Sequence, residues 1–161
     1  MNISYRSQDW RERILSNLAH TPFVMEVGSQ HCICNSVEGF WQGLKCHDAM
    51  REHVFLLSGL AAKNAGRSKR GPRFEFGGRK YEVGSQEHED LICAAVRAKV
   101  LQNPKAAQAL LESRGILTHR VPTKNRPIFK IENLLRGVYL ELSKSGALAN
   151  AATPKTAAKR T

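Results

Sequence analysis

The Asn103-Pro104 pair constrains the fold most, because it interrupts the longest segment with a helical pattern. Proline cannot continue a helix, but it is well tolerated in the first turn of a new one. Upstream, Ser85 is a typical N-cap, and the acidic residues after it complement the helix dipole. The sequence therefore predicts two successive helices, the second of which ends at Gly115. Apolar residues of the first helix predict an inward stripe of Leu91, Ala94, Ala95, Ala98 and Leu101.

Glycine turns predict two short hairpins. Gly28-Ser29 lies at the centre of the segment from Val24 to Ile33, which suggests two short strands around a turn. Gly77-Gly78 separates residues 73–76 from residues 79–83, which is the pattern of a two-residue hairpin. Residues 116–121 are a further candidate strand.

The other elements are expected to be helices. Ser36, or alternatively Asn35, caps a helix that runs to about Cys46. Another helix begins near Asp48 and is interrupted by Gly59, and a short stretch from residue 60 ends at Gly66, which is placed for a left-handed helix terminus. A last helix covers residues 131–142. The predicted fold class is α+β: one mostly helical domain with a few short strands, over residues 1–142.

The composition predicts a basic, soluble protein with a C-terminal tail. Residues 143–161 are small, polar and basic, so a mobile tail is expected there. The net charge of +11 favours nucleic acid or nucleotide phosphates as partners. No segment reaches the roughly 18 consecutive apolar residues of a membrane helix, and the first residues lack a signal core. We therefore expect a cytoplasmic protein that does not enter a membrane.

The cysteines do not form a recognisable metal motif. Cys32, Cys34 and Cys46 lie near His31 and His47, but the Cys-x-Cys spacing is tighter than in usual zinc sites and no second pair follows. Reduced structural thiols are the expectation, with neither a metal nor another cofactor.

The segment from Ser36 to Lys45 carries the candidate chemistry. On a helix, Glu38, Trp41, Gln42 and Lys45 share one face, while Val37, Phe40 and Leu44 form a separate apolar stripe. The polar face would be a solvated flank in an ordinary helix. Its tryptophan favours a cleft instead, because a large indole beside charges is better placed in a cleft than in open water.

These residue types suit cleavage of a glycosidic bond. The helix dipole favours the ionised form of Glu38, which would stabilise an oxocarbenium ion at ribose C1 or polarise an attacking water. Lys45 would hold a phosphate or attack an opened ribose aldehyde. Ordinary glycoside hydrolases use two carboxylates. A single convincing carboxylate therefore indicates a leaving group that needs no strong dedicated acid, such as a nucleobase.

Five motifs in consistent order resemble the NADAR family, the YbiA-like N-glycosidases. They are Leu15-Ser16-Asn17-Leu18, Thr21-Pro22-Phe23, Ser36-Val37-Glu38 through Lys45, Ala62-Lys63-Asn64-Ala65-Gly66-Arg67, and residues 97–104 with Gln102-Asn103-Pro104 at the helix end. The likeness covers about residues 5–142. It implies hydrolysis of an N-glycosidic bond in an ADP-ribose-type or phosphoribosylated substrate, including removal of ADP-ribose from guanine in DNA.

The resemblance also implies roles for individual residues. Glu38 would be the catalytic carboxylate with Lys45 as its partner, and Asn17 would hydrogen-bond the ribose or the base. Trp41 and Gln42 would line the pocket, while Lys63 and Arg67 would hold phosphate, a role for which the planar guanidinium of arginine is well suited.

The sequence departs from the family downstream. Many members carry an Asp-x-x-Trp-Gly-x-Gly segment, whereas residues 117–127 contain neither that Asp nor that Trp. His119, Arg120, Lys124 or Arg126 would replace them and make the rim more basic. Three alternatives therefore remain: a hydrolase of phosphoribosyl-amine metabolites, as in riboflavin synthesis, a non-catalytic reader of ADP-ribose or nucleic acid, and a plain nucleic-acid-binding protein.

Overall fold

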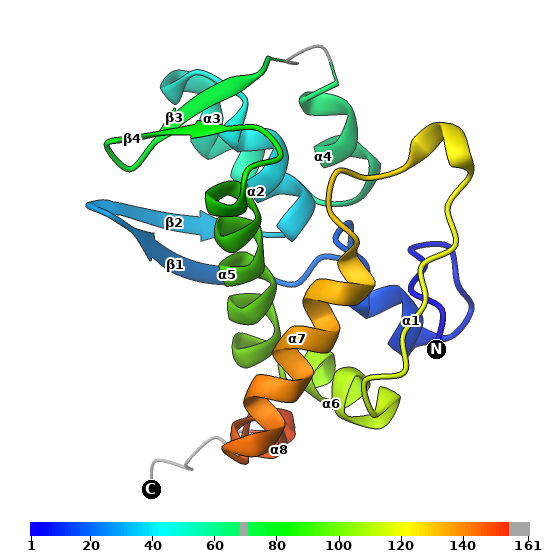
Figure 1. Cartoon of the computed structure of the whole chain (residues 1–161). Coiled ribbons are helices and arrows are strands. Elements are labelled where there is room, and N and C mark those ends of the chain that lie inside the picture. Colours follow the sequence, from blue (N-terminus) through cyan, green and yellow to red (C-terminus); the bar gives the residue numbers. More distant parts are fainter. Residues whose placement is uncertain (68–70, 155–161) are drawn as a thin grey trace, which may run out of the picture.

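A long helix, α5, runs through the middle of the molecule in the computed structural model, which describes residues 1–67 and 71–154 (Figure 1). It contacts four other helices and two strands. In chain order the elements are α1 (Trp10–Leu15), β1 (Phe23–Val27), β2 (Gln30–Cys34), α2 (Val37–Leu44), α3 (Asp48–Phe55), α4 (Gly59–Ala65), β3 (Arg73–Phe76), β4 (Arg79–Glu82), α5 (Gln86–Gln102), α6 (Pro104–Ser113), a 3₁₀ turn η1 (Thr123–Asn125), α7 (Ile131–Lys144) and α8 (Ala147–Ala152). The predicted fold class, a mostly helical α+β domain, is confirmed.

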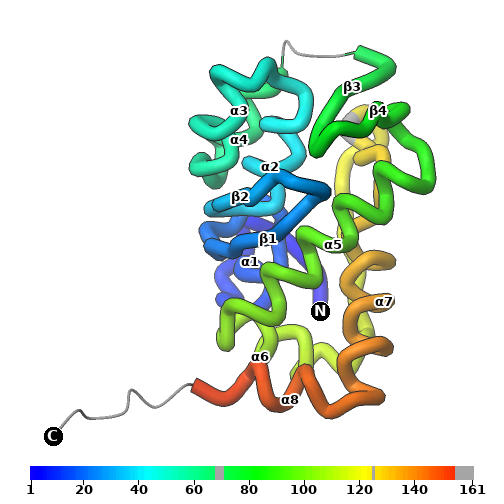
Figure 2. Tube along the Cα trace, turned by 90° about the vertical axis from the view of Figure 1, so that its left-hand side faces the viewer, coloured from blue at the N-terminus to red at the C-terminus, as the bar shows by residue number. Residues whose placement is uncertain are grey.

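Both predicted hairpins form. β1 pairs antiparallel with β2, with Phe23 opposite Cys34, and β3 pairs with β4, with Phe74 opposite Tyr81. Each hairpin turns its buried aromatic residues toward the helices, so the strands cover one part of the core. In Figure 2 the β3–β4 hairpin lies at the start of α5, whereas β1–β2 lies farther along the helix, where Gln102 at the end of α5 bonds to Val24 of β1.

The predicted caps are also present. The Ser36 hydroxyl accepts a hydrogen bond from the Gly39 amide, and Ser85 accepts one from His88. Pro104 begins α6. The predicted stripe of α5 is wrong in part, because Ala94 is exposed. The buried face is instead made of Leu91, Ile92, Ala95, Val96, Lys99 and Val100, and it includes a lysine that hydrophobic periodicity could not identify.

Three predictions are corrected by the structure. Gly66 has φ −97°, so it is not a left-handed terminus. Residues 116–121 form no strand, because their one ladder contact is an isolated parallel bridge between Asn2 and Thr118. The mobile tail does not begin at residue 143: α7 continues to Lys144, and α8 packs on α6 and α7 with Leu148 fully buried.

The reason for the last correction lies in the composition of the tail. Averaged over residues 143–161, the sequence is small and polar, which hides one leucine inside an alanine-rich stretch that favours a helix. The expectation of a mobile tail for residues 155–161 lies outside the described residues. Within the described part, no helix is both long and apolar enough to cross a membrane.

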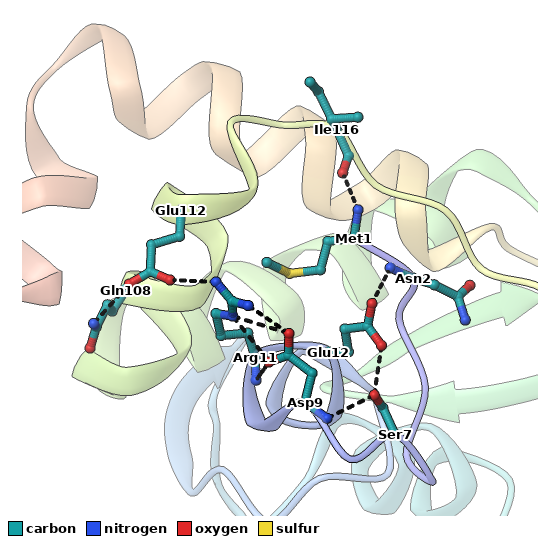
Figure 3. A network of polar contacts seen from close by, with 9 residues as sticks. All are labelled: Met1, Asn2, Ser7, Asp9, Arg11, Glu12, Gln108, Glu112 and Ile116. Atoms are coloured by element: carbon teal, nitrogen blue, oxygen red, sulfur yellow. Dashed lines mark hydrogen bonds and ion pairs between the residues drawn. The ribbon is translucent and has the colours of Figure 1, made fainter.

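Polar contacts fasten the N-terminal segment to the C-terminal half of the chain (Figure 3). The amino group of Met1 donates to the Ile116 carbonyl, 3.1 Å away. The Glu12 carboxylate accepts hydrogen bonds from the Asn2 amide at 2.7 Å and the Ser7 hydroxyl at 2.6 Å, and these bonds lower its pKa. Arg11 pairs with Asp9 and reaches Glu112 on α6. This network fixes α1, and so fixes the segment after it that leads to the candidate site.

We predict that Leu148→Ala lowers the free energy of unfolding by about 2–5 kcal/mol, because it leaves a cavity in the core. Leu140→Ala on α7 is the control, since this leucine is 53% exposed and its truncation should cost less than about 0.5 kcal/mol. Urea denaturation measures both. Equal small effects would show that α8 does not belong to the folded unit.

Candidate active site on helix α2

Helix α2 is held in close contact with the segment that follows α3. Ser36 caps the helix and donates its hydroxyl proton to the Leu57 carbonyl at 2.8 Å. A Cβ on Gly39 would lie only 2.5 Å from the same carbonyl oxygen, so glycine is needed at this approach. The predicted apolar stripe, Val37, Phe40 and Leu44, is fully buried. The other face of α2 is therefore fixed in direction.

That other face carries a row of three hydrogen-bonded polar side chains. The Gln42 amide nitrogen donates to Glu38 Oε1 at 2.8 Å, and Lys45 Nζ donates to Gln42 Oε1, also at 2.8 Å. Gln42 is buried, while Glu38 and Lys45 are half-buried. We call Glu38, Gln42 and Lys45 the polar row. Its amide connects a carboxylate to an ammonium, and both charged groups keep some access to solvent.

The end of α4 packs against the middle of the polar row. A Cβ on Gly66 would lie 1.9 Å from Gln42 Oε1, so only a glycine fits beside this amide. Lys63 on α4 and Arg67 just after Gly66 have exposed side chains. The backbone of Gly66 therefore contacts the polar row, whereas the guanidinium of Arg67 is exposed to solvent. Lys63 lies one turn before this contact.

Asn17 lies at the start of α2. Its carbonyl accepts a hydrogen bond from the Glu38 amide at 2.9 Å. Its side-chain Oδ1 is buried and has no hydrogen-bond partner among the described residues. An unsatisfied buried acceptor is unfavourable unless a ligand or water supplies a donor. The backbones of Asn17 and Glu38 are therefore in direct contact, and the role of the Asn17 side chain stays a prediction.

Trp41 contacts both His88 and Lys45. Its ring stacks on the imidazole of His88, with centroids 4.4 Å apart and planes at 21°, and Lys45 Nζ lies 4.5 Å from the ring centroid. The indole thus supports Lys45 by a cation–π contact. The ring is half-buried.

His88 is the residue near the site that the sequence did not reveal. It is fully buried, with the edges of Phe74 and Phe129 against it. The Gly84 amide donates to its Nδ1 at 3.1 Å, which puts the proton of the neutral ring on Nε2. Burial, and secondarily the positive charge of Lys45, lowers the pKa of His88 to about 4. No local sequence pattern marks it, because its burial depends on residues far along the chain.

His119 is not brought to the polar row. It lines a cavity of about 310 Å³ together with Val121, Arg126, Pro127, Lys130 and Glu132. Burial lowers the pKa of His119, and the Glu132 carboxylate opposes this change. The connection to α2 is indirect, because Phe129, next to Lys130, contacts His88, and His88 in turn stacks on Trp41.

Lys99 is a second buried group that sequence reasoning missed as a functional residue. Its side chain is 1% exposed, and Nζ donates to the Ser16 carbonyl at 2.7 Å. Burial lowers the pKa of Lys99 to about 7.

The cysteines lie in the core as free thiols. Cys32, Cys34 and Cys46 are buried, and burial raises the pKa of Cys32 to about 11. In the part of the chain that the structure describes, no group of three or more His, Cys, Asp or Glu residues is placed to hold a metal ion.

Comparisons with known proteins identify relatives of the chain. Residues 9–132 match the model of the family described as bacteriophage protein GP30.3. A 17.1 kDa protein of Enterobacteria phage T4, from the Gp30-rIII intergenic region, is 36% identical over 119 residues, which are 70% of this chain and 75% of that protein. The NMR structure of E. coli YbiA superposes with a TM-score of 0.58 and 19% identity, over 96% of this chain and 92% of YbiA. At this identity, the likeness to YbiA shows the fold.

Stability should fall in acid because of His88. The unfolded chain binds a proton at this residue near pH 6.5, whereas the folded protein resists protonation until about pH 4. Stability from this group is therefore complete above pH 6.5 and is lost as the pH falls toward 4, at up to roughly 1.4 kcal/mol per pH unit. In chemical denaturation between pH 7.5 and 4.5, His88→Phe should flatten this slope. The exposed His20→Gln should leave it unchanged, and identical slopes in all three proteins would contradict the assignment.

Proposed function

Because this chain belongs to the bacteriophage protein GP30.3 family and has the fold of YbiA, we propose that it is an N-glycosidase. Its substrate would be an ADP-ribose-type molecule, in which a ribose C1 is bonded to a nitrogen atom. The leading candidate for the leaving group is a guanine that carries ADP-ribose within nucleic acid. The observation that carries the proposal is the polar row on α2, which joins Glu38 to Lys45 through Gln42.

Glu38 would be the catalytic carboxylate. It lies in the first turn of α2, where the helix dipole favours negative charge. Gln42 binds its Oε1, which orients the carboxylate and leaves Oε2 for the reaction. In the reaction, the bond from C1 to nitrogen breaks and the electron pair leaves with the base. The carboxylate stabilises the positive charge at C1 and takes a proton from the attacking water. The departing base receives a proton from solvent.

Lys45 has two chemical roles open to it. As an ammonium it would bind a substrate phosphate. As an unprotonated amine it would attack the C1 aldehyde of a ring-opened ribose and form a Schiff base with loss of water. Its Nζ is held by Gln42 Oε1 and by the Trp41 ring, so it is fixed relative to Glu38. Lys63 and Arg67 extend the positive charge at the end of α4, where the phosphates of ADP-ribose would bind.

We predict that Glu38→Gln lowers turnover at least about 100-fold while the protein stays folded, since general acid–base and electrostatic effects each contribute that much. The assay is release of ADP-ribose from a guanine-modified oligonucleotide. The control is Glu52→Gln, an exposed glutamate on α3. Unchanged turnover in Glu38→Gln would remove Glu38 from the mechanism. Tight binding of ADP-ribose by the wild type without any product would favour a non-catalytic reader.

Borohydride added during turnover distinguishes the two roles of Lys45. If the amine forms a Schiff base, reduction leaves the ribose moiety attached to Lys45, and peptide mass spectrometry locates it. Lys45→Arg should lose the adduct. A wild type that turns over without any adduct would leave Lys45 as a phosphate ligand.

The same assay on a free phosphoribosyl-amine nucleotide tests the alternative substrate class. Higher kcat/KM on the free nucleotide than on the oligonucleotide would assign the enzyme to small metabolites. Preference for the oligonucleotide, declining steeply with added salt, is expected if the net charge of +11 serves to bind nucleic acid.

A further inference from the structure

The segment Ser16–Leu18 is held by a different partner at each of its carbonyl groups. The Ser16 carbonyl accepts from Lys99 Nζ on α5 at 2.7 Å. The Asn17 carbonyl accepts from the Glu38 amide on α2 at 2.9 Å, and the Leu18 carbonyl accepts from the Gly59 amide on α4 at 2.7 Å. Three helices that are separate in the sequence therefore meet at one short loop.

Side chains at the C-terminal end of α5 also bind the backbone of residues 22 and 24. The side-chain amide nitrogen of Asn103 donates to the Pro22 carbonyl at 2.8 Å. The Gln102 side chain exchanges two hydrogen bonds of 2.8 Å with the backbone of Val24. The chain between residues 16 and 24 thus follows α5 through side-chain contacts, and Lys99 makes the contact closest to Asn17.

Burying a lysine side chain to make that contact is energetically unfavourable. Its amino group is buried, and its one hydrogen bond within the described chain goes to an uncharged carbonyl. Removing a charge from water without an opposite charge is unfavourable, and a leucine or methionine would fill the same volume more stably. A buried lysine here is explained if the exact position of the loop matters for function.

Asn17 supplies the functional reason. Its Oδ1 is buried, has no partner among the described residues, and belongs to the residue whose backbone is bonded to the amide of Glu38. An amide oxygen in this state is ready to accept a hydrogen bond from an O–H or N–H group of a ligand.

We propose that Lys99 is a positioning residue, whose amino group fixes Ser16–Leu18 and thereby orients the Asn17 amide oxygen to bind a hydroxyl or amino group of the substrate. The role rests on the proposed function, since it assumes that the substrate reacts at Glu38. Lys99 itself does not touch the substrate.

A double-mutant cycle on turnover tests this role. Lys99→Met and Asn17→Ala should each lower kcat/KM by about 10- to 100-fold, as expected when a fixed hydrogen bond to substrate is lost. The double variant should be no slower than the slower single variant, because Lys99 acts through Asn17. Additive losses in the double variant, or wild-type turnover by folded Lys99→Met, would overturn the proposal.

A matched control separates positioning from general stability. Val96→Ala removes a fully buried side chain three residues earlier on α5, so it should destabilise the protein without reducing turnover by more than about twofold below the unfolding transition. If Lys99→Met does not fold, Lys99→Arg replaces it: the longer guanidinium keeps hydrogen-bond donors but displaces the loop, and turnover should still fall.

A measurement without substrate keeps this inference separate from the proposed function. The side-chain NH₂ resonances of Asn17 should be sharp and dispersed in the wild type and in Val96→Ala, but broadened or averaged in the Lys99 variant. If the wild type turns over no substrate, the proposed function fails, and this spectrum still decides the positioning. Unchanged Asn17 resonances in the Lys99 variant would refute it.

Discussion

The close approach of α2 to the segment after α3 is the constraint on which the candidate site depends. Gly39 removes the side chain that would collide with the Leu57 carbonyl, and Ser36 bonds to that same carbonyl. With Phe40 packed between Phe55 and Phe76, the helix cannot rotate. Because rotation is blocked, Gln42 stays against Gly66 at the end of α4, and the Glu38 amide stays bonded to the Asn17 carbonyl.

In the polar row, the Gln42 amide links a carboxylate to a lysine amino group. The Gln42 amide has one donating and one accepting end, and each end meets the group of matching character. Glu38 and Lys45 are thereby oriented and stay half-exposed. A side chain at position 66 would collide with this amide, and the glycine there avoids the collision. Such preorganisation is what a site needs if charge is to be stabilised as it develops in a reaction.

Two buried polar residues, His88 and Lys99, lie behind the candidate site. His88 stacks behind Trp41 as a neutral ring, and Lys99 holds the loop that carries Asn17. Each of them is unfavourable to bury: His88 contacts Trp41 of the candidate site, and Lys99 contacts Ser16, the neighbour of Asn17. The downstream segment that differs from the YbiA-like pattern forms a separate basic cavity around His119 and Arg126. Phe129, next to this segment, contacts His88, which stacks on Trp41.

Local chemistry by itself determined most of the helices, both hairpins and the polar face of α2. Caps at Ser36 and Ser85, glycine turns and Pro104 act within a few residues, so they can be recognised without knowledge of the fold. Helical spacing likewise predicts that Glu38, Gln42 and Lys45 are neighbours. Contacts between distant residues could not be predicted in this way: the burial of His88 and Lys99, the bond from Lys99 to Ser16, and the packing of Leu148. These depend on which side chains meet across 80 or so residues of chain, as Lys99 and Ser16 do with a separation of 83. Only the tertiary structure decides this, because burial, and with it the energy of every charge and hydrogen bond, is a property of the packed core and not of the local sequence.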